Sequence, residues 1–387
     1  MKRIHRMSSL LAVVIPLSVQ AGTIVPEFLV TTQGEVFADK RNVTGSCNSS
    51  GQTVLVWLDY RDAGQRKNFN SKWPQTYVQY IDASGVPQGS NVRLNTGSDY
   101  MYFSAPPAAA IFDDGMALVA TTREDRRGLE DRYENSVIRL WDADEGFEGT
   151  PLAEFELEVK MPVLAPYGDS FCLAFQNTTY LDTNLIEFQR FTRTGQMLGE
   201  SVFVDTGSVQ CIIVDDVGNF VIGYAPRYYR RYDKDGEPAG ERVILDSLAI
   251  AFFLAGDPGG EILCCRIEVD EDWNTYIYSQ RFSASDEPVG PRYEIAQGAQ
   301  TLAMSRGYNG GHLVVWRNED TLYGRRLDAS GAPQGQPFRI NEPGAVEFTY
   351  YFWIGASEGR YHVAWIEDNM VYTRSVLPTG ILGTQLR

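Results

Sequence analysis

Short runs in which apolar and polar residues alternate recur along the whole chain, separated by clusters of Gly, Asp, Ser and Pro. Alternation with a period of two is typical of strands with one buried face, and the residues between the runs favour tight turns. No segment has a convincing 3.6-residue apolar period, so we expect almost no helix. The pattern predicts an all-β protein of many short strands.

One marker of an internal repeat is a turn residue followed, six positions later, by the end of an apolar run. It leads from Gly51 to Trp57 and from Gly310 to Trp316. Because large aromatic residues dominate this end position, we expect it to pack between neighbouring sheets, with Thr121 and Arg266 marking less regular copies. The seven end positions are Trp57, Thr121, Phe175, Tyr224, Arg266, Trp316 and Trp365.

A second marker confirms the phase of the repeat. The run Asp82–Gly89 (DASGVPQG) recurs almost unchanged as Asp328–Gly335 (DASGAPQG), with weaker copies between and after them. Both markers return about every 50 residues, a spacing typical of repeat architectures. Each unit contains four predicted strands, which in the fourth unit are residues 210–215, 219–225, 227–232 and 241–246.

Units of four strands and about 40–50 residues are the signature of a β-propeller. A lone four-stranded sheet has two faces to cover, and a closed ring of such sheets covers both. The seventh unit ends in a truncated strand at Thr384–Arg387, whereas Pro26–Gly34 resembles the last strand of a unit. We therefore predict a seven-bladed β-propeller of four-stranded antiparallel blades, closed by the N-terminal strand, and expect deletion of residues 22–32 to destabilise it.

The first 21 residues have the three parts of a secretory signal peptide. Lys2, Arg3 and Arg6 precede an apolar core, and Val19-Gln20-Ala21 offers a cleavage site. The apolar core is shorter than the roughly 20 residues that span a bilayer, and no later segment reaches that length. We expect cleavage near Ala21, a single propeller domain over residues 22–387, and a secreted or periplasmic protein.

Composition narrows the possible functions. The chain has 50 Asp and Glu against 34 Lys and Arg, for a net charge of −16, which argues against binding to nucleic acid. Five Cys in 387 residues do not form a disulfide scaffold, and three His make a His-based metal site improbable. We predict no cofactor and no metal site, and we expect a monomer.

Candidate binding residues lie in the loops between the second and third strands of the blades. These b–c loops vary in length and concentrate Arg and Tyr, which suit carboxylate or sulfate groups and apolar sugar faces. The alternative is that the loops are simply solvated, with weak charge pairing. The candidates are Asp59, Arg61, Arg66, Trp73, Arg123, Arg126, Arg127, Arg227, Tyr228 and Tyr229.

The repeats resemble those of bacterial exported β-propeller repeat proteins. The segments that carry the resemblance are Leu313–Trp316 with Phe338–Asn341, and Tyr276–Ser283 (YIYSQRFS). The resemblance covers essentially the whole mature chain and implies fold and export, but little about activity. The aspartate box of sialidases (Ser-x-Asp-x-Gly-x-Thr-Trp) does not occur.

Three functional hypotheses follow. The regular repeats favour a non-catalytic module that binds a cell-envelope protein or an acidic glycan through the b–c loop face. The long, uneven loops of the first two blades keep open a polysaccharide lyase or glycoside hydrolase with its site on that face. A purely structural envelope component is the third.

Overall fold

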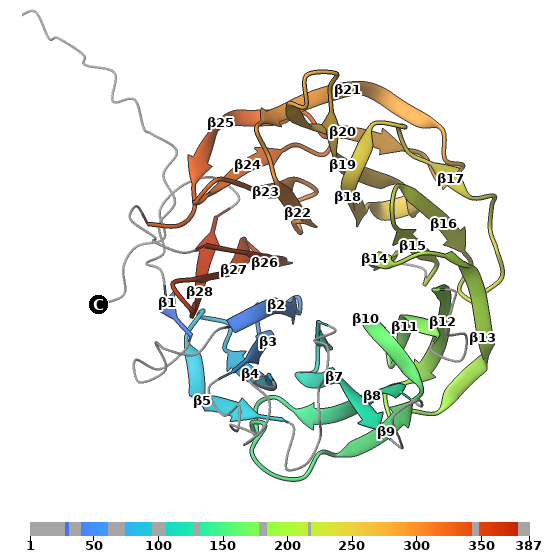
Figure 1. The fold of residues 1–387 in the computed structure, drawn as a ribbon, viewed down its shortest axis with the longest axis vertical. Coiled ribbons are helices and arrows are strands. Elements are labelled where there is room, and N and C mark those ends of the chain that lie inside the picture. The colour runs from blue at the N-terminus through green and yellow to red at the C-terminus, as the bar shows by residue number, and fades with distance from the viewer. Residues whose placement is uncertain are drawn as a thin grey trace, which may run out of the picture.

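The computed structural model describes residues 28–30, 40–60, 74–94, 106–126, 132–177, 184–215, 218–342 and 348–377. Seven four-stranded sheets stand around a central axis, in chain order from blue to red (Figure 1). All strand pairs are antiparallel, and the strands of each blade are called a to d outwards from the axis. The chain is therefore a seven-bladed β-propeller, as predicted.

The first four blades are consecutive along the chain, with each sheet ordered as in the sequence. Blade 1 is β2 (Lys40–Cys47), β3 (Thr53–Asp59), β4 (Gln75–Ile81) and β5 (Pro87–Arg93). Blade 2 is β6 (Ala108–Ile111), β7 (Met116–Arg126), β8 (Arg132–Asp142) and β9 (Ala153–Leu157). Blade 3 is β10 (Val159–Tyr167), β11 (Ser170–Asn177), β12 (Leu185–Thr192) and β13 (Met197–Thr206). Blade 4 is β14 (Val209–Val214), β15 (Phe220–Tyr224), β16 (Tyr228–Tyr232) and β17 (Val243–Ile244).

The last three blades complete the ring, and the described residues contain one short 3-10 turn, Pro258–Gly260. Blade 5 is β18 (Ala249–Gly256), β19 (Ile262–Val269), β20 (Thr275–Phe282) and β21 (Pro288–Gln297). Blade 6 is β22 (Thr301–Arg306), β23 (His312–Asn318), β24 (Thr321–Leu327) and β25 (Pro333–Arg339). Blade 7 is β26 (Phe348–Ser357), β27 (Arg360–Glu367), β28 (Met370–Val376) and β1 (Phe28–Leu29).

The hydrophobic core is divided among the blade interfaces. Seven clusters of buried side chains each join two neighbouring blades, and the last one joins blade 7 to blade 1. Because side chains alternate along a strand, β3 sends Val54 and Val56 towards blade 2, and Leu55 and Trp57 towards blade 7. The strands near the axis thus pack on both faces, which explains why β3 is a nearly continuous apolar run and not an alternating one.

The end position of strand b is equivalent in all seven blades, as the repeat predicted. Its residues are buried, from 0% exposed for Trp57 and Trp365 to 5% for Arg266. In blades 1, 6 and 7 its Trp stacks on the Tyr paired with it on strand c, with ring centroids 5.8–6.2 Å apart. Blade 5 has full-length strands despite Arg266, so its irregularity lies in the side chains and not in the backbone.

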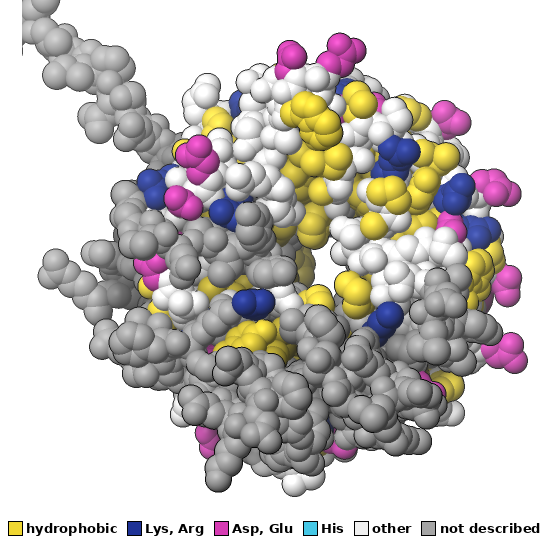
Figure 2. All heavy atoms as spheres, viewed as in Figure 1, with side chains coloured by type: hydrophobic (Ala, Val, Ile, Leu, Met, Phe, Trp, Pro, Cys, Tyr) yellow, Lys and Arg dark blue, Asp and Glu magenta, His cyan; other side chains and the backbone are white. Residues whose placement is uncertain are grey.

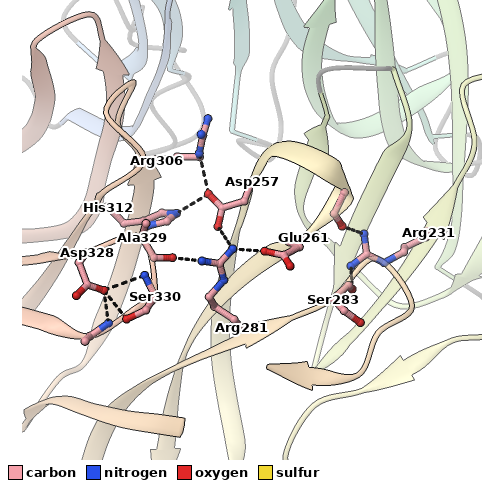
Figure 3. Close-up of polar contacts among 12 residues, drawn as sticks. Arg231, Asp257, Glu261, Arg281, Ser283, Arg306, His312, Asp328, Ala329 and Ser330 are labelled. Atoms are coloured by element: carbon pink, nitrogen blue, oxygen red, sulfur yellow. Dashed lines mark hydrogen bonds and ion pairs between the residues drawn. The ribbon is translucent and has the colours of Figure 1, made fainter. Parts of the chain in front are cut away.

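Side chains near the end of strand c tie neighbouring blades together. Arg190 donates to the carbonyls of Lys234 and Asp235 at 2.5 and 2.6 Å, and Arg231 donates to Asp286 at 2.6 Å. Figure 3 shows two such arginines, with Arg231 reaching Ser283 and Arg281 reaching Ala329. Each contact meets the c–d turn of the following blade, which explains why that turn is a strong repeat marker.

The N-terminal strand closes the ring. β1 pairs with β28 in antiparallel register, with Phe28 opposite Thr373, and the amide of Val30 donates to the carbonyl of Val371 at 2.9 Å. Val30 is buried in the cluster that joins blades 7 and 1. The predicted closure is confirmed, whereas the predicted signal peptide, residues 1–21, lies outside the described residues.

A buried histidine in blade 7 makes the stability depend on pH. Burial, reinforced by the charge of Arg360, lowers the pKa of His362 from 6.5 to about 4. His362 is 2% exposed, and Ser357 Oγ lies 3.0 Å from its Nε2. Between these two pKa values the unfolded chain binds a proton that the native chain does not, so stability falls as the pH drops through this window.

We expect this histidine to cost the native state roughly 3 kcal/mol between pH 7 and pH 4. His362→Gln removes the titrating group, so its unfolding free energy should fall less over the same interval. Denaturant titrations of both proteins at pH 7 and pH 4 measure the difference. Equal losses of stability in the two proteins would contradict the assignment.

Candidate functional site

The structure describes the side chains of only some of the predicted binding residues. Arg61, Arg66, Trp73 and Arg127 lie outside the described residues, and their role stays a prediction. Arg123 and Arg126 lie on β7, where their backbones pair with Asn135 and Arg132 of β8, and their side chains lie outside the description. The structure places the side chains of Asp59, Arg227, Tyr228 and Tyr229.

Asp59 is buried within blade 1 and is not on the loop surface. Its side chain is 0% exposed and lies 3.7 Å from the ammonium group of Lys40, which is also fully buried. The register of β2 and β3 places Lys40 directly opposite Asp59. Trp57 Nε1 also donates to the Asp59 carboxylate at 3.3 Å. This carboxylate therefore neutralises a buried cation.

The three candidates of blade 4 point in different directions. Tyr229 is fully buried towards blade 5, where its hydroxyl donates to Asp286 at 2.9 Å. Tyr228 faces the other way and lies beneath the guanidinium of Arg242, 4.7 Å from its ring centre. Arg227 is half-buried and donates to the carbonyl of Ser247 in the connection to blade 5. Of these three, Arg227 contacts the connection whose Asp246 and Leu248 line the recess described next.

A recess of about 400 Å³ opens on the b–c face between blades 4 and 5. Its blade 4 side is formed by Asp246 and Leu248, from the connection that leads into β18. Its blade 5 side is formed by side chains from the end of β19 and from β20 and β21. Those residues are Glu268, Val269, Asp270, Tyr276, Tyr278 and Arg292.

Arg266 explains the polar lining of this recess. It occupies the buried position where blades 1, 6 and 7 have Trp, and its Nε donates to Glu268 at 2.5 Å. Trp365 donates in the same way to Glu367 at 2.9 Å, so a carboxylate two residues after the end position recurs as an acceptor. In blade 5 the donor is a guanidinium, and the carboxylate can bind a second cation.

That second cation is Arg292, which organises the floor of the recess. Its guanidinium pairs with the other carboxylate oxygen of Glu268, lies 3.5 Å from Asp246 and stacks 3.6 Å from the ring centre of Tyr278. Both oxygens of Glu268 are thus held by guanidinium groups, which suits a fixed acceptor better than a proton donor. The arrangement is preorganised for binding.

Leu248 lines the recess, and three other large apolar side chains, close in the sequence to residues that line it, are exposed to solvent. Ile244, Leu248 and Ile250 are 54–60% exposed, and Trp273 is 85% exposed. In Figure 2, hydrophobic side chains gather over the part of the ring where blades 4 to 6 lie in Figure 1. Contiguous exposed apolar surface marks an interaction site more often than isolated side chains do.

A larger recess, of about 700 Å³, lies between blades 1 and 2 at the opposite face. Asp144 accepts hydrogen bonds there from Tyr80 at 2.6 Å and from Gln52 at 2.9 Å. The pKa of the Tyr80 hydroxyl is raised mainly by burial and, to a smaller extent, by its hydrogen bond to Asp144. These contacts hold the c–d turn of blade 2 against blade 1, which gives the polar groups a structural role.

Among the residues that the structure describes, no group of three or more His, Cys, Asp or Glu side chains is placed to hold a metal ion. That part of the chain also contains no helix that is long and apolar enough to cross a membrane.

The sequence contains a signal for the recess that loop length and loop composition do not reveal. Arg266 departs from the aromatic pattern, and Trp273 lies in the short turn Asp270–Asn274 (DEDWN) immediately after that strand. Long loops in blades 1 and 2 and the Arg- and Tyr-rich loop of blade 4 predict a site elsewhere, whereas the recess depends on a short turn in blade 5.

Comparison with known proteins identifies the fold. No protein-family model matches the chain, and no curated protein matches it in sequence. The WD40 domain of Toxoplasma gondii coronin is 12% identical, with a TM-score of 0.55 over 92% of this chain and 89% of that chain. The polysaccharide lyase Uly1 is 10% identical, with a TM-score of 0.54 over 84% and 88%. Chaetomium thermophilum Raptor is 11% identical, with a TM-score of 0.56 over 89% of this chain and 30% of that chain. At these identities the likeness concerns the fold alone.

Proposed function

We propose that this chain is an exported, non-catalytic binding module that uses its b–c face for a cell-envelope protein or a glycan. The observation that carries the proposal is the cluster of exposed apolar residues around the recess of blade 5. On the opposite face, the exposed Val86 and Leu152 come from separate blades, and the exposed Tyr167 and Tyr308 line one recess there. The cluster therefore supports the b–c face over the a–b face as the binding surface.

The structural neighbours are compatible with this proposal. A WD40 domain and a polysaccharide lyase both share the propeller fold, so the fold alone does not decide between binding and catalysis. In the recess described above, Glu268 is held by two guanidinium groups, which favours binding over acid–base chemistry. The lyase or hydrolase alternative predicts release of unsaturated or reducing sugar ends, which an assay on polysaccharides measures.

A paired substitution tests the binding face. Leu248→Asp with Ile250→Asp places two charges in the apolar cluster and should weaken binding to envelope protein or polysaccharide fractions about tenfold or more. Val86→Asp with Leu152→Asp adds the same charge on the opposite face and serves as the control. Surface plasmon resonance with the mature protein immobilised measures both variants. Equal loss in both, or wild-type binding by the first variant, would contradict the proposal.

A further inference from the structure

The recess of blade 5 carries an aromatic wall next to fixed polar groups. Tyr276 and Tyr278 project from the same side of β20, with ring centroids 6.2 Å apart and planes inclined by 25°. The guanidinium of Arg292 covers the ring of Tyr278. Tyr276 is half-exposed, and its hydroxyl donates to Asp270 at 3.1 Å. This hydrogen bond is the largest cause that raises the pKa of Tyr276.

Trp273 lies in the turn between β19 and β20, three residues before Tyr276. Its φ of 65° is left-handed, a conformation that glycine adopts at Gly85 and Gly331 in the c–d turns and that Glu319, Asp368 and Asn369 adopt in the b–c turns of blades 6 and 7. The amide of Trp273 donates to the carbonyl of Asp270, whose side chain accepts from the amides of Asp272 and Asn274. The turn therefore holds a bulky, 85% exposed indole in a conformation that bulky residues disfavour. Such a residue is better explained by contact with a ligand than by folding.

The charges of the recess indicate which ligand it accepts. Three carboxylates, of Asp246, Glu268 and Asp270, face two guanidinium groups, of Arg266 and Arg292. An anionic ligand would meet an excess of negative charge, on a protein whose net charge is already −16. A cationic ligand would compete with Arg292 for Asp246 and Glu268. A neutral ligand with hydroxyl groups avoids both conflicts.

We propose that this recess binds a neutral oligosaccharide. Sugar hydroxyls would donate to Asp246 and Asp270 and accept from Arg292, while the apolar face of a sugar ring packs on Trp273 or Tyr276. The rigid turn and the stacked guanidinium present these groups already in place, which lowers the entropic cost of binding. This inference rests on the proposed function and specifies the ligand for the same face.

Calorimetry of the mature protein with hexasaccharides of glucose, mannose, xylose and N-acetylglucosamine tests the inference. At least one should bind, and Trp273→Ala should weaken that binding by about tenfold or more. Asp246→Asn should weaken it as well. Tyr308→Ala, which removes a 53% exposed aromatic ring from the opposite face, is the matched control and should bind as the wild type does.

The outcomes separate this inference from the proposed function. Binding of polygalacturonate or alginate with no binding of the neutral hexasaccharides would overturn the neutral-glycan assignment, and so would equal affinity in Trp273→Ala. If only an envelope protein binds, and Leu248→Asp with Ile250→Asp abolishes that binding, the proposed function stands and this inference fails. Unchanged protein and sugar binding in every b–c face variant would overturn both.

Discussion

Deletion of residues 22–32 is expected to destabilise the whole ring by roughly 3–6 kcal/mol, as judged from one buried Val and the backbone hydrogen bonds of β1. Val30 belongs to the cluster that joins blades 7 and 1, so its loss opens the last interface of the ring. It also leaves β28 as an unpaired sheet edge, which favours association between chains. Thermal and denaturant unfolding, followed by tryptophan fluorescence, measure the effect.

Two substitutions test whether the ring is stabilised by the buried side chain of the N-terminal strand, and not only by the presence of an N-terminal segment. Val30→Asp buries a charge at a side chain that is 4% exposed and should cost roughly 3 kcal/mol. Val86→Asp makes the same change at a valine that is 42% exposed and should have little effect. An unchanged melting temperature after the deletion, or equal effects of the two substitutions, would refute closure by the N-terminal strand.

Asp257→Ala is expected to destabilise the protein by up to roughly 3 kcal/mol, because Asp257 is buried while its partners Arg306 and Arg281 are 30% and 16% exposed. Asp257 is 5% exposed and lies between blades 5 and 6 (Figure 3). It accepts from Arg306 Nε at 2.7 Å and lies 3.3 Å from Arg281 and 3.5 Å from His312. Removing the carboxylate leaves these basic groups without their shared acceptor.

The same carboxylate contributes to acid sensitivity. Burial alone would raise the pKa of Asp257, but the hydrogen bond and charge of His312, with the charges of Arg281 and Arg306, outweigh it and hold the pKa below its usual value of 3.8. A carboxyl group with a depressed pKa stabilises the native state above its unfolded pKa and loses that contribution as the pH falls through the folded one. Wild-type stability should therefore fall more steeply below pH 4 than that of Asp257→Ala.

Asp114→Ala is the matched control for Asp257. Asp114 pairs with Arg193 between blades, but the two side chains are 50% and 33% exposed. Exposed pairs contribute about 0–1 kcal/mol, so this variant should remain close to the wild type. Equal losses in both variants under urea denaturation would show that burial does not set the strength of these contacts.

Much of the architecture could be predicted because local signals repeat. Turn chemistry and two-residue alternation located the strands of blade 4 to within a few residues, including the short β17. The end position of strand b was predicted to pack between blades, and Trp57 and Trp365 confirm it. These features depend on interactions between residues that are close in the sequence. Because each feature occurs in seven copies, the copies together predict the fold more clearly than one copy does.

Side-chain roles were harder to predict because they depend on partners distant in the chain. The position of Asp59 after an apolar run predicts a loop surface, but cross-strand register places it beside Lys40 in the interior. Tyr228 and Tyr229 are neighbours in sequence, and the pleat of β16 directs Tyr229 into the interface with blade 5.

The amino-acid pattern predicts seven four-stranded units and an N-terminal strand that completes the last of them, because periodicity and turn residues act over a few positions. Which polar groups meet depends instead on how the blades are placed around the axis. The recess of blade 5 exists because the connection through Asp246 and Leu248 reaches the end of β19, where Arg266 replaces an aromatic ring. Such a meeting depends on how two sheets face each other around the axis, a geometry that neither unit encodes alone.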